Sequence, residues 1–189
     1  LPNSIELIGG ENIVVKNCQL GAQPTGITCK VQEVNKLSFI NNQVYPDGRE
    51  NLVLDACNNC VIEGNNFKSY YNGILVLNGN DNTVNKNIFW LTGAVQNQLL
   101  DHGDDFGIIN VKGNNNMVAS NSLSCEWAYA GAVTVNAIQG TGNVFKNCFV
   151  DNLESYRVFL VNAQTEVSNC VSSDKVLSLI HISEPTRLR

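Results

Sequence analysis

The amino-acid sequence predicts an all-β protein, a right-handed parallel β-helix (solenoid) of about seven coils whose turns carry an asparagine ladder. Three observations lead to this prediction. Short segments built on one template recur along the chain, a second apolar run precedes each of them, and no stretch shows helical periodicity. Asparagine, with 29 residues, stands out in a composition that has ample Val, Ile and Leu, as expected for tight turns between buried strands.

In most copies of the template an apolar residue lies three positions before an Asn, and in most another apolar residue lies two positions after it. Its copies, in chain order, are "ENIVVKNCQL", "NKLSFINNQV", "NNCVIEGNNF", "DNTVNKNIF", "NNMVASNSL", "GNVFKNCFV" and "TEVSNCVS". The aligned asparagines are Asn17, Asn42, Asn65, Asn87, Asn121, Asn147 and Asn169. We expect these side chains to stack at one inward turn and to have a structural role.

The second apolar run of each repeat also alternates like a strand. These runs are "SIELIGG", "GITCKV", "NLVLDAC", "GILVLNG", "GIINVKG", "AVTVNAI" and "VFLVNAQ". Turn dipeptides such as "GN", "NG" and "GG" separate strands. The leucine-rich signature LxxLxLxxN is absent, which favours the β-helix over a leucine-rich repeat.

The template also predicts which side chains lie inside. We expect the residues two positions after the aligned Asn to fill the core: Val44, Phe67, Phe89, Leu123, Phe149 and Val171. Residues one position after it would point outward: Cys18, Ile88, Cys148 and Cys170. Such an apolar outer column suggests a covered face or a subunit contact.

The sequence predicts one domain over residues 1–176. The chain begins at Leu1 with no charged n-region before an apolar run, so it reads as a piece of a longer protein. "LSLIHISEPTR" breaks the repeat and resembles a translated sequencing adapter, so we exclude residues 177–189 from the fold. No run has the length of a membrane span, and no membrane partner is expected.

Composition narrows the possible partners. A formal net charge of −5 and 15% charged residues argue against nucleic acid, which attracts clustered Lys and Arg. The seven cysteines have no paired-spacing framework, and "CNNC" at Cys57 to Cys60 is a lone CxxC. Zinc is therefore not expected, and the cysteines read as small hydrophobes.

One interval of the repeat is longer than the others. The gap from Asn87 to Asn121 is 34 residues, whereas the others are 22 to 26, and "WLTGAVQNQLLDHGDDF" reads as a loop thrown out from the rod. Its acidic residues and His102 could supply an acid, a base or a cation site. The spacing of "DHGDD" is not that of an EF-hand.

At this point the residues carry a family resemblance. "LDACNNCVIEGNNF…NGILVLNGNDNTVNKNIF…GDDFGIINVKGNNNMVASNSL" resembles the inulin fructotransferases and the related difructose dianhydride hydrolases. The resemblance implies a homotrimer of parallel rods with active sites between subunits, a fructan or difructose dianhydride substrate, and no metal or other cofactor. It also implies that the family's N-terminal coils are missing. A transferase acting on polymeric inulin would be secreted, and a dianhydride hydrolase cytoplasmic.

The family pattern also directs attention to particular side chains. Its catalytic Asp lies in a "PDG" turn with a Glu about ten residues on, but here Thr25 takes the place of that Asp. We expect the catalytic carboxylates to be Glu33, Asp104 and Asp105, and the substrate-binding residues to be Arg49, Asp47 and His102. A simple Pro-Asp-Gly turn and a surface ion pair are the alternatives for Asp47 and Arg49.

Two other functions remain open from the sequence. A β-helix polysaccharide lyase or epimerase would need a calcium site or a basic residue near the acids, for which Arg49 and Lys112 are the candidates. A non-catalytic carbohydrate-binding β-helix would explain why Thr25 takes the place of the family's catalytic Asp. The "DDFG" insertion favours the fructan-active enzyme instead.

Overall fold

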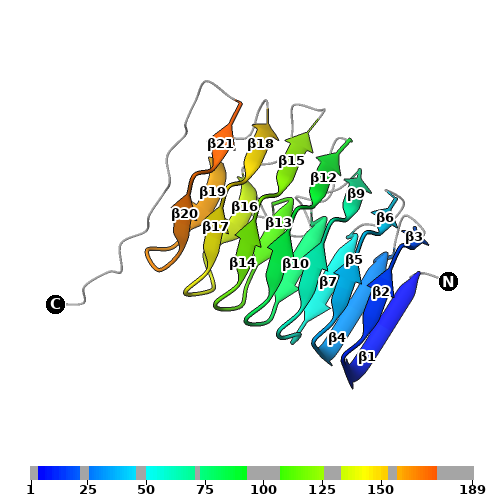
Figure 1. Ribbon diagram of the computed structural model, residues 1–189. Coiled ribbons are helices and arrows are strands. Elements are labelled where there is room, and N and C mark those ends of the chain that lie inside the picture. The colour runs from blue at the N-terminus through cyan, green and yellow to red at the C-terminus, as the bar shows by residue number, and fades with distance from the viewer. Residues whose placement is uncertain are drawn as a thin grey trace.

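A computed structural model describes residues 4–21, 26–45, 50–70, 73–92, 107–125, 133–152 and 157–173. These residues form three parallel sheets of seven strands each, and the coils stack into a rod with β1 at one end and β19 to β21 at the other (Figure 1). Successive strands of one coil belong to different sheets, so each sheet is made from every third strand.

The strands are short and evenly distributed among the sheets. The first sheet contains β1 (Ile5–Glu11), β4 (Cys29–Asn35), β7 (Leu52–Asp55), β10 (Leu75–Asn78), β13 (Ile109–Val111), β16 (Val133–Ala137) and β19 (Arg157–Val161). The second contains β2 (Val14–Lys16), β5 (Ser38–Ile40), β8 (Val61–Glu63), β11 (Thr83–Asn85), β14 (Met117–Ala119), β17 (Val144–Lys146) and β20 (Glu166–Ser168). The third contains β3 (Gln19–Leu20), β6 (Gln43–Val44), β9 (Asn66–Ser69), β12 (Ile88–Leu91), β15 (Ser122–Cys125), β18 (Phe149–Asn152) and β21 (Val171–Ser172).

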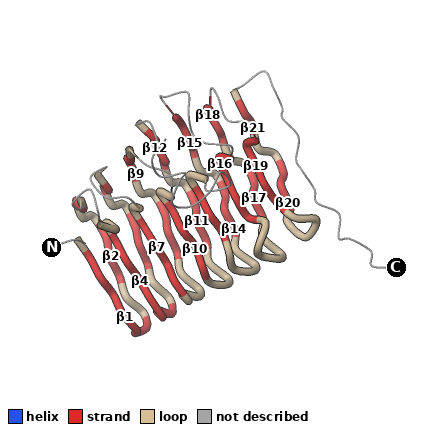
Figure 2. The backbone as a smooth tube through the Cα atoms, turned by 180° about the vertical axis from the view of Figure 1, so that it is seen from behind, coloured by secondary structure: helices blue, strands red, loops and turns tan. Residues whose placement is uncertain are grey.

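Every pairing between these strands is parallel. Leu75 of β10, for example, aligns with Leu52 of β7 on one side and with Ile109 of β13 on the other. The described part of the chain contains strands and turns and no helix, and hence no helix that is long and apolar enough to span a membrane (Figure 2). The predicted fold, a parallel β-helix with an asparagine ladder, is confirmed.

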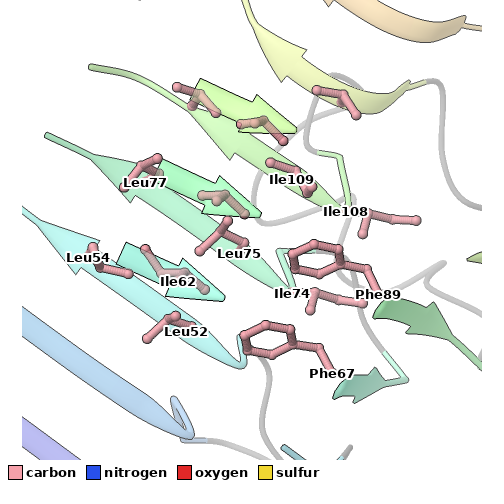
Figure 3. Packing of buried hydrophobic residues seen from close by; sticks show 14 of the residues in the cluster. Leu52, Leu54, Ile62, Phe67, Ile74, Leu75, Leu77, Phe89, Ile108 and Ile109 are labelled. Atoms are coloured by element: carbon pink, nitrogen blue, oxygen red, sulfur yellow. The ribbon is translucent and has the colours of Figure 1, made fainter. Parts of the chain in front are cut away.

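The core lies between the three sheets and repeats from coil to coil. Alternate residues of each strand point inward, as Leu52 and Leu54 do on β7, and their equivalents stack above them in the next coils (Figure 3). Phe67 of the third sheet stacks on Phe89 of the same sheet, with ring centroids 5.0 Å apart, and on Phe39 of the second sheet, 6.2 Å away. This stacking buries the aromatic rings along the rod axis.

The turn from the second sheet to the third carries the asparagine ladder. The side-chain amides of Asn42, Asn65, Asn87 and Asn121 are all buried, and each Nδ2 donates to the Oδ1 of the next at 2.9–3.0 Å. Each Oδ1 also accepts the backbone N–H of the Asn one coil earlier. The ladder therefore satisfies backbone and side-chain groups that the turn would otherwise leave unpaired.

The predicted ladder is wrong by one position in three coils. Strand register aligns Val15 with Phe39, Val118 with Phe145 and Phe149 with Val171, so the ladder position holds Cys18, Cys148 and Cys170 there. Asn17, Asn147 and Asn169 instead occupy the preceding turn position with φ of 55°, 54° and 51°. Asparagine tolerates this left-handed conformation, which is why the two positions read alike in sequence.

The same shift corrects the predicted inside and outside. Cys148 is buried in the core, and Cys18 and Cys170 are half-buried and pack against it, so these thiols do not point outward. Phe149 and Val171 are 45% and 59% exposed rather than buried. Val44, Phe67, Phe89 and Leu123 are buried and Ile88 is exposed, as predicted.

Candidate functional site

Most of the residues that the sequence singled out lie outside the described residues. These are Thr25, Asp47, Arg49, Asp101, His102, Asp104 and Asp105, and all belong to segments that join a strand of the third sheet to the next strand of the first. Their predicted roles stay predictions. The chain order nevertheless shows which strands they precede: Asp47 and Arg49 come before β7, and the long insertion comes before β13.

Glu33 is the predicted catalytic residue that the structure does describe. It lies within β4, but the pairing with β1 skips it, because Gln32 aligns with Ile8 and Val34 with Gly10. Glu33 (φ 54°) and its opposite residue Gly9 (φ 67°) are both in the left-handed region, so the two strands kink together without a change of register, and the Glu33 side chain is exposed. Within the described part of the chain, no hydrogen bond or ion pair holds the Glu33 carboxylate in place.

The outer face of the first sheet holds a different carboxylate in a defined position. Alternation along β7 buries Leu52 and Leu54 and turns Val53 and Asp55 outward. The half-buried Asp55 accepts hydrogen bonds from two neighbouring coils, at 2.7 Å from Asn78 Nδ2 to Oδ1 and at 3.5 Å from Gln32 Nε2 to Oδ2. The short bond from Asn78 orients the carboxylate, and Gln32 adds a longer contact to its other oxygen.

Other side chains of this face complete a surface of mixed polarity. Val53 and Val76, aligned on β7 and β10, form a half-buried apolar strip beside the polar row. The exposed Lys112 follows Asn78 along the rod, as the hydrogen bond from its N–H to Leu77 O at 2.8 Å shows. Apolar surface with a few fixed polar groups is the usual composition of a small-molecule site.

Two buried side chains fix the backbone where undescribed segments rejoin the first sheet. Asn110 closes a turn directly after the long insertion, because its amide accepts from Gly107 N at 2.9 Å and donates to Gly107 O at 2.7 Å. Asn51, which follows the segment with Asp47 and Arg49, donates to Lys68 O at 2.8 Å. Both segments therefore enter the sheet from anchored points.

The sequence analysis did not predict that Asp55, Gln32 and Asn78 form a site. Alternation in "NLVLDAC" and "GILVLNG" does indicate that Asp55 and Asn78 face outward. What the sequence does not provide is the register that brings three residues more than 20 positions apart into one row.

Four cysteines form two pairs. The Cys60 thiol hydrogen-bonds Cys57 and lowers the pKa of Cys57 to about 7, while the same bond together with burial raises the pKa of Cys60. Cys170 does the same to Cys148, whose pKa is lowered to about 7. Among the described residues no three His, Cys, Asp or Glu side chains gather as a metal-binding group.

Comparison with protein families gives one match. A family model described as "Periplasmic copper-binding protein (NosD)" matches residues 1–166 of this chain. No curated protein matches the chain.

Several solved structures of one enzyme have the same fold as this chain. DFA-IIIase from Arthrobacter chlorophenolicus A6 in complex with GF2 has a TM-score of 0.73 and 22% identity, over 88% of this chain and 44% of that one. The same enzyme without its lid has a TM-score of 0.73 and 19% identity, over 93% of this chain and 56% of that one. Its complex with DFA-III has a TM-score of 0.70 and 20% identity, over 94% of this chain and 51% of that one. This chain thus spans about half the length of these proteins, and the likeness shows a shared fold.

Proposed function

The chain belongs to the NosD family, and we propose that it is a fructan-active β-helix enzyme whose substrate binds on the outer face of the first sheet. The substrate would be a fructan or a difructose dianhydride. The fold shared with DFA-IIIase and the resemblance of the repeat segments to inulin fructotransferases support this proposal. The observation that carries it is the Asp55 carboxylate, fixed by Gln32 and Asn78 on an open face.

Transfer or hydrolysis of a fructosyl group needs two carboxyl functions. One protonates the leaving glycosidic oxygen, and the other assists attack at the anomeric carbon by a sugar hydroxyl or by water. Asp55 would be one of them, because its two amide donors keep it directed to the same point on the face. Glu33, Asp104 and Asp105 are the proposed sources of the second.

Binding of the sugar would draw on the segments that border this face. Asp47 and Arg49 come five and three residues before β7 begins at Leu52, so the chain carries them close to the first-sheet strand that bears Asp55. We assign Arg49, Asp47 and His102 to sugar hydroxyls, since charged side chains form strong hydrogen bonds to them. Val53 and Val76 would contact the apolar faces of the rings.

Activity of an Asp55 variant tests this function. The protein is incubated with inulin and, separately, with difructose dianhydride III, and the products are separated by chromatography. We expect dianhydride from inulin, or inulobiose from the dianhydride, and at least a ~100-fold loss of rate for Asp55→Asn, because an amide cannot transfer the proton. Asp81→Asn is the matched control, since Asp81 is exposed at a turn with φ of 58°, where asparagine fits.

Other outcomes of the same assay separate the alternatives. Binding of inulin without product, weakened by Asp55→Asn, would replace the enzyme by a carbohydrate-binding β-helix. An unsaturated product from a polyuronide would indicate a lyase. Full activity of Asp55→Asn would show that Asp55 is not catalytic. The carboxylates of the undescribed segments would then be the remaining candidates.

A second candidate function follows from the family's description, which names copper. Soft thiolates select Cu(I), and Cys57 and Cys60 provide two buried thiols three residues apart, the donor type that this ion prefers. Bound copper would supply redox chemistry, which transfer of a fructosyl group does not use. Competition for Cu(I) between the protein and a chromophoric chelator, compared with Cys57→Ser, measures this binding directly.

We further propose that the protein is a homotrimer that associates through the third sheet. Ile88, Phe149 and Val171 occupy one outward register position on this sheet, with Ser122 between Ile88 and Phe149, and are 49%, 45% and 59% exposed. An apolar column along a rod gives a second rod a surface to pack against.

A further inference from the structure

The asparagine ladder ends in two cysteines. Asn42, Asn65, Asn87 and Asn121 link consecutive coils through their amides, and Cys148 and Cys170 occupy the same turn position in the next two coils. A cysteine offers no second polar group, so the amide link between coils cannot continue there. Their thiols pair with backbone carbonyls instead, Cys148 Sγ with Val118 O at 3.6 Å and Cys170 Sγ with Ser168 O at 3.5 Å.

The backbone places these cysteines side by side. Phe149 aligns with Val171, and the N–H of Val171 donates to the carbonyl of Cys148 at 2.9 Å, so residues 148 and 170 are direct neighbours in adjacent coils. Parallel neighbours lie about 4.8 Å apart. That separation is within the range that a disulfide requires between α-carbons, roughly 4.4–6.8 Å.

The side chains also point to the same side. Cys148 is 3% exposed within the core, and Cys170 is half-buried against it. Cys148 Sγ lies 3.5 Å from Lys146 O, and Cys170 Sγ lies 3.5 Å from Ser168 O, each the carbonyl two residues earlier. Both cysteines are free thiols in the structure. A bond between them requires the two side chains to rotate toward each other from these positions.

We propose that Cys148 and Cys170 form a disulfide that joins two coils covalently at the end of the asparagine ladder. The oxidant would be a small disulfide such as glutathione disulfide. One protein thiol loses its proton and attacks a sulfur of glutathione disulfide, which expels the first glutathione thiolate. The second thiol then loses its proton and attacks the protein sulfur of the mixed disulfide, expelling the second glutathione. Two protein thiols are oxidised by two electrons, and one glutathione disulfide is reduced to two glutathiones.

The sequence allows the bridge to be separated from the other cysteine pair. Trypsin cuts after Lys146, Arg157 and Lys175, so Cys148 and Cys170 fall on different peptides, 147–157 and 158–175. Cys57 and Cys60 stay together on peptide 50–68. A bond between peptides 147–157 and 158–175 is therefore diagnostic, whereas oxidation of Cys57 with Cys60 leaves a single peptide two hydrogens lighter.

The test equilibrates the whole protein at several ratios of glutathione disulfide to glutathione, blocks free thiols with iodoacetamide, and maps the peptides by mass. We expect the linked peptides 147–157 and 158–175 in the oxidised samples. Reduction should lower Tm by about 5–10 °C in the natural chain and by much less in Cys170→Ser.

Three results would overturn the proposal. The two peptides could remain separately alkylated at every ratio, they could carry glutathione without a bond between them, or a linked pair could leave Tm unchanged on reduction. Uptake of Cu(I) by the same two thiols with no bond after oxidation would assign them to metal binding. The peptide map uses the natural chain, so it decides the question even if Cys170→Ser does not fold.

Discussion

Asn65 shows how much one side chain contributes in this fold. Its Oδ1 accepts from the backbone N–H and the Nδ2 of Asn42, and its Nδ2 donates to Phe39 O and to Asn87 Oδ1, all within 2.8–3.0 Å. These groups are buried, so each would lose its partner without gaining water.

We expect Asn65→Ala to lower the free energy of unfolding by about 3 kcal/mol, because it orphans several buried polar groups at once. Asn66→Ala is the control: Asn66 is the next residue, and it faces outward and half-buried on β9. Its replacement should cost less than about 0.5 kcal/mol. Urea unfolding followed by circular dichroism measures both, and equal losses would show that the ladder does not stabilise the fold.

Cys29 provides a pH-dependent test at the same scale. Burial, with a smaller effect of Cys18, raises the pKa of this thiol to about 12 from an ordinary value of 9.0. Below pH 9 the thiol is protonated in both the folded and unfolded chains. Between about pH 9 and pH 12 the unfolded chain loses the proton and the folded one keeps it, so stability falls by up to ~1.4 kcal/mol per pH unit.

A Cys29→Val variant should therefore lose less stability than the natural chain between about pH 8 and about pH 10.5. Urea midpoints at the two pH values give the comparison, and the other titrating groups contribute alike to both proteins. Parallel losses in the two proteins would mean that the Cys29 thiol ionises within the fold.

Residue identity was predictable in the coils whose ladder position holds an amide. Asn42, Asn65, Asn87 and Asn121 lie where the template put them, and each amide pairs with buried groups of the adjacent coils. In three coils the Asn of the template occupies the left-handed turn position, and the next residue, a cysteine, occupies the ladder position. The ambiguity arises because asparagine suits both positions and spacing cannot distinguish them.

At the scale of elements, the turn after the first sheet depends on glycine at Gly79, Gly113 and Gly140. A Cβ on Gly113 would collide with the carbonyl of Gly79, and one on Gly140 with the carbonyl of Gly113. The clashing atoms are backbone, so they cannot move aside as a flexible side chain could.

Gly113→Ala should consequently destabilise the protein by at least about 3 kcal/mol, since two coils must separate to admit the methyl group. Gly9→Ala is the comparison, because no atom lies within 4 Å of its added Cβ although its φ is 67°. That change should cost about 1 kcal/mol through backbone strain alone. Thermal unfolding of both variants decides whether close contact or strain dominates at these turns.

Elements were predicted better than the site they build. All seven apolar runs became strands of the first sheet, because alternation and turn residues are local signals. The row of Gln32, Asp55 and Asn78 depends on how three strands from consecutive coils are aligned, and no single strand's sequence contains that register. A search for carboxylates by motif led to Glu33, whose left-handed φ kinks the strand in a way that the sequence does not display.

At the scale of the whole molecule, the rod has no single centre, and its coils differ in how well their neighbours cover them. Leu52, Leu54 and Phe67 of one interior coil are fully buried, whereas Ile5, Leu7 and Val15 of the first coil are partly buried. In a solenoid each coil is stabilised chiefly by contact with its neighbours, so opening should begin at the coil whose apolar side chains are less buried.

Hydrogen exchange measures this gradient and also tests how copies associate. We expect amides of β7 to β9 to exchange at least about 10-fold more slowly than those of β1 to β3. A trimer that packs through Ile88, Phe149 and Val171 covers the side of the rod and does not cover the first coil, so the gradient should remain. Copies that associate through β1 would instead protect that strand. A trimeric mass by light scattering together with a preserved gradient therefore supports side-by-side rods. The same mass with a protected β1 would contradict the proposed contact through the third sheet.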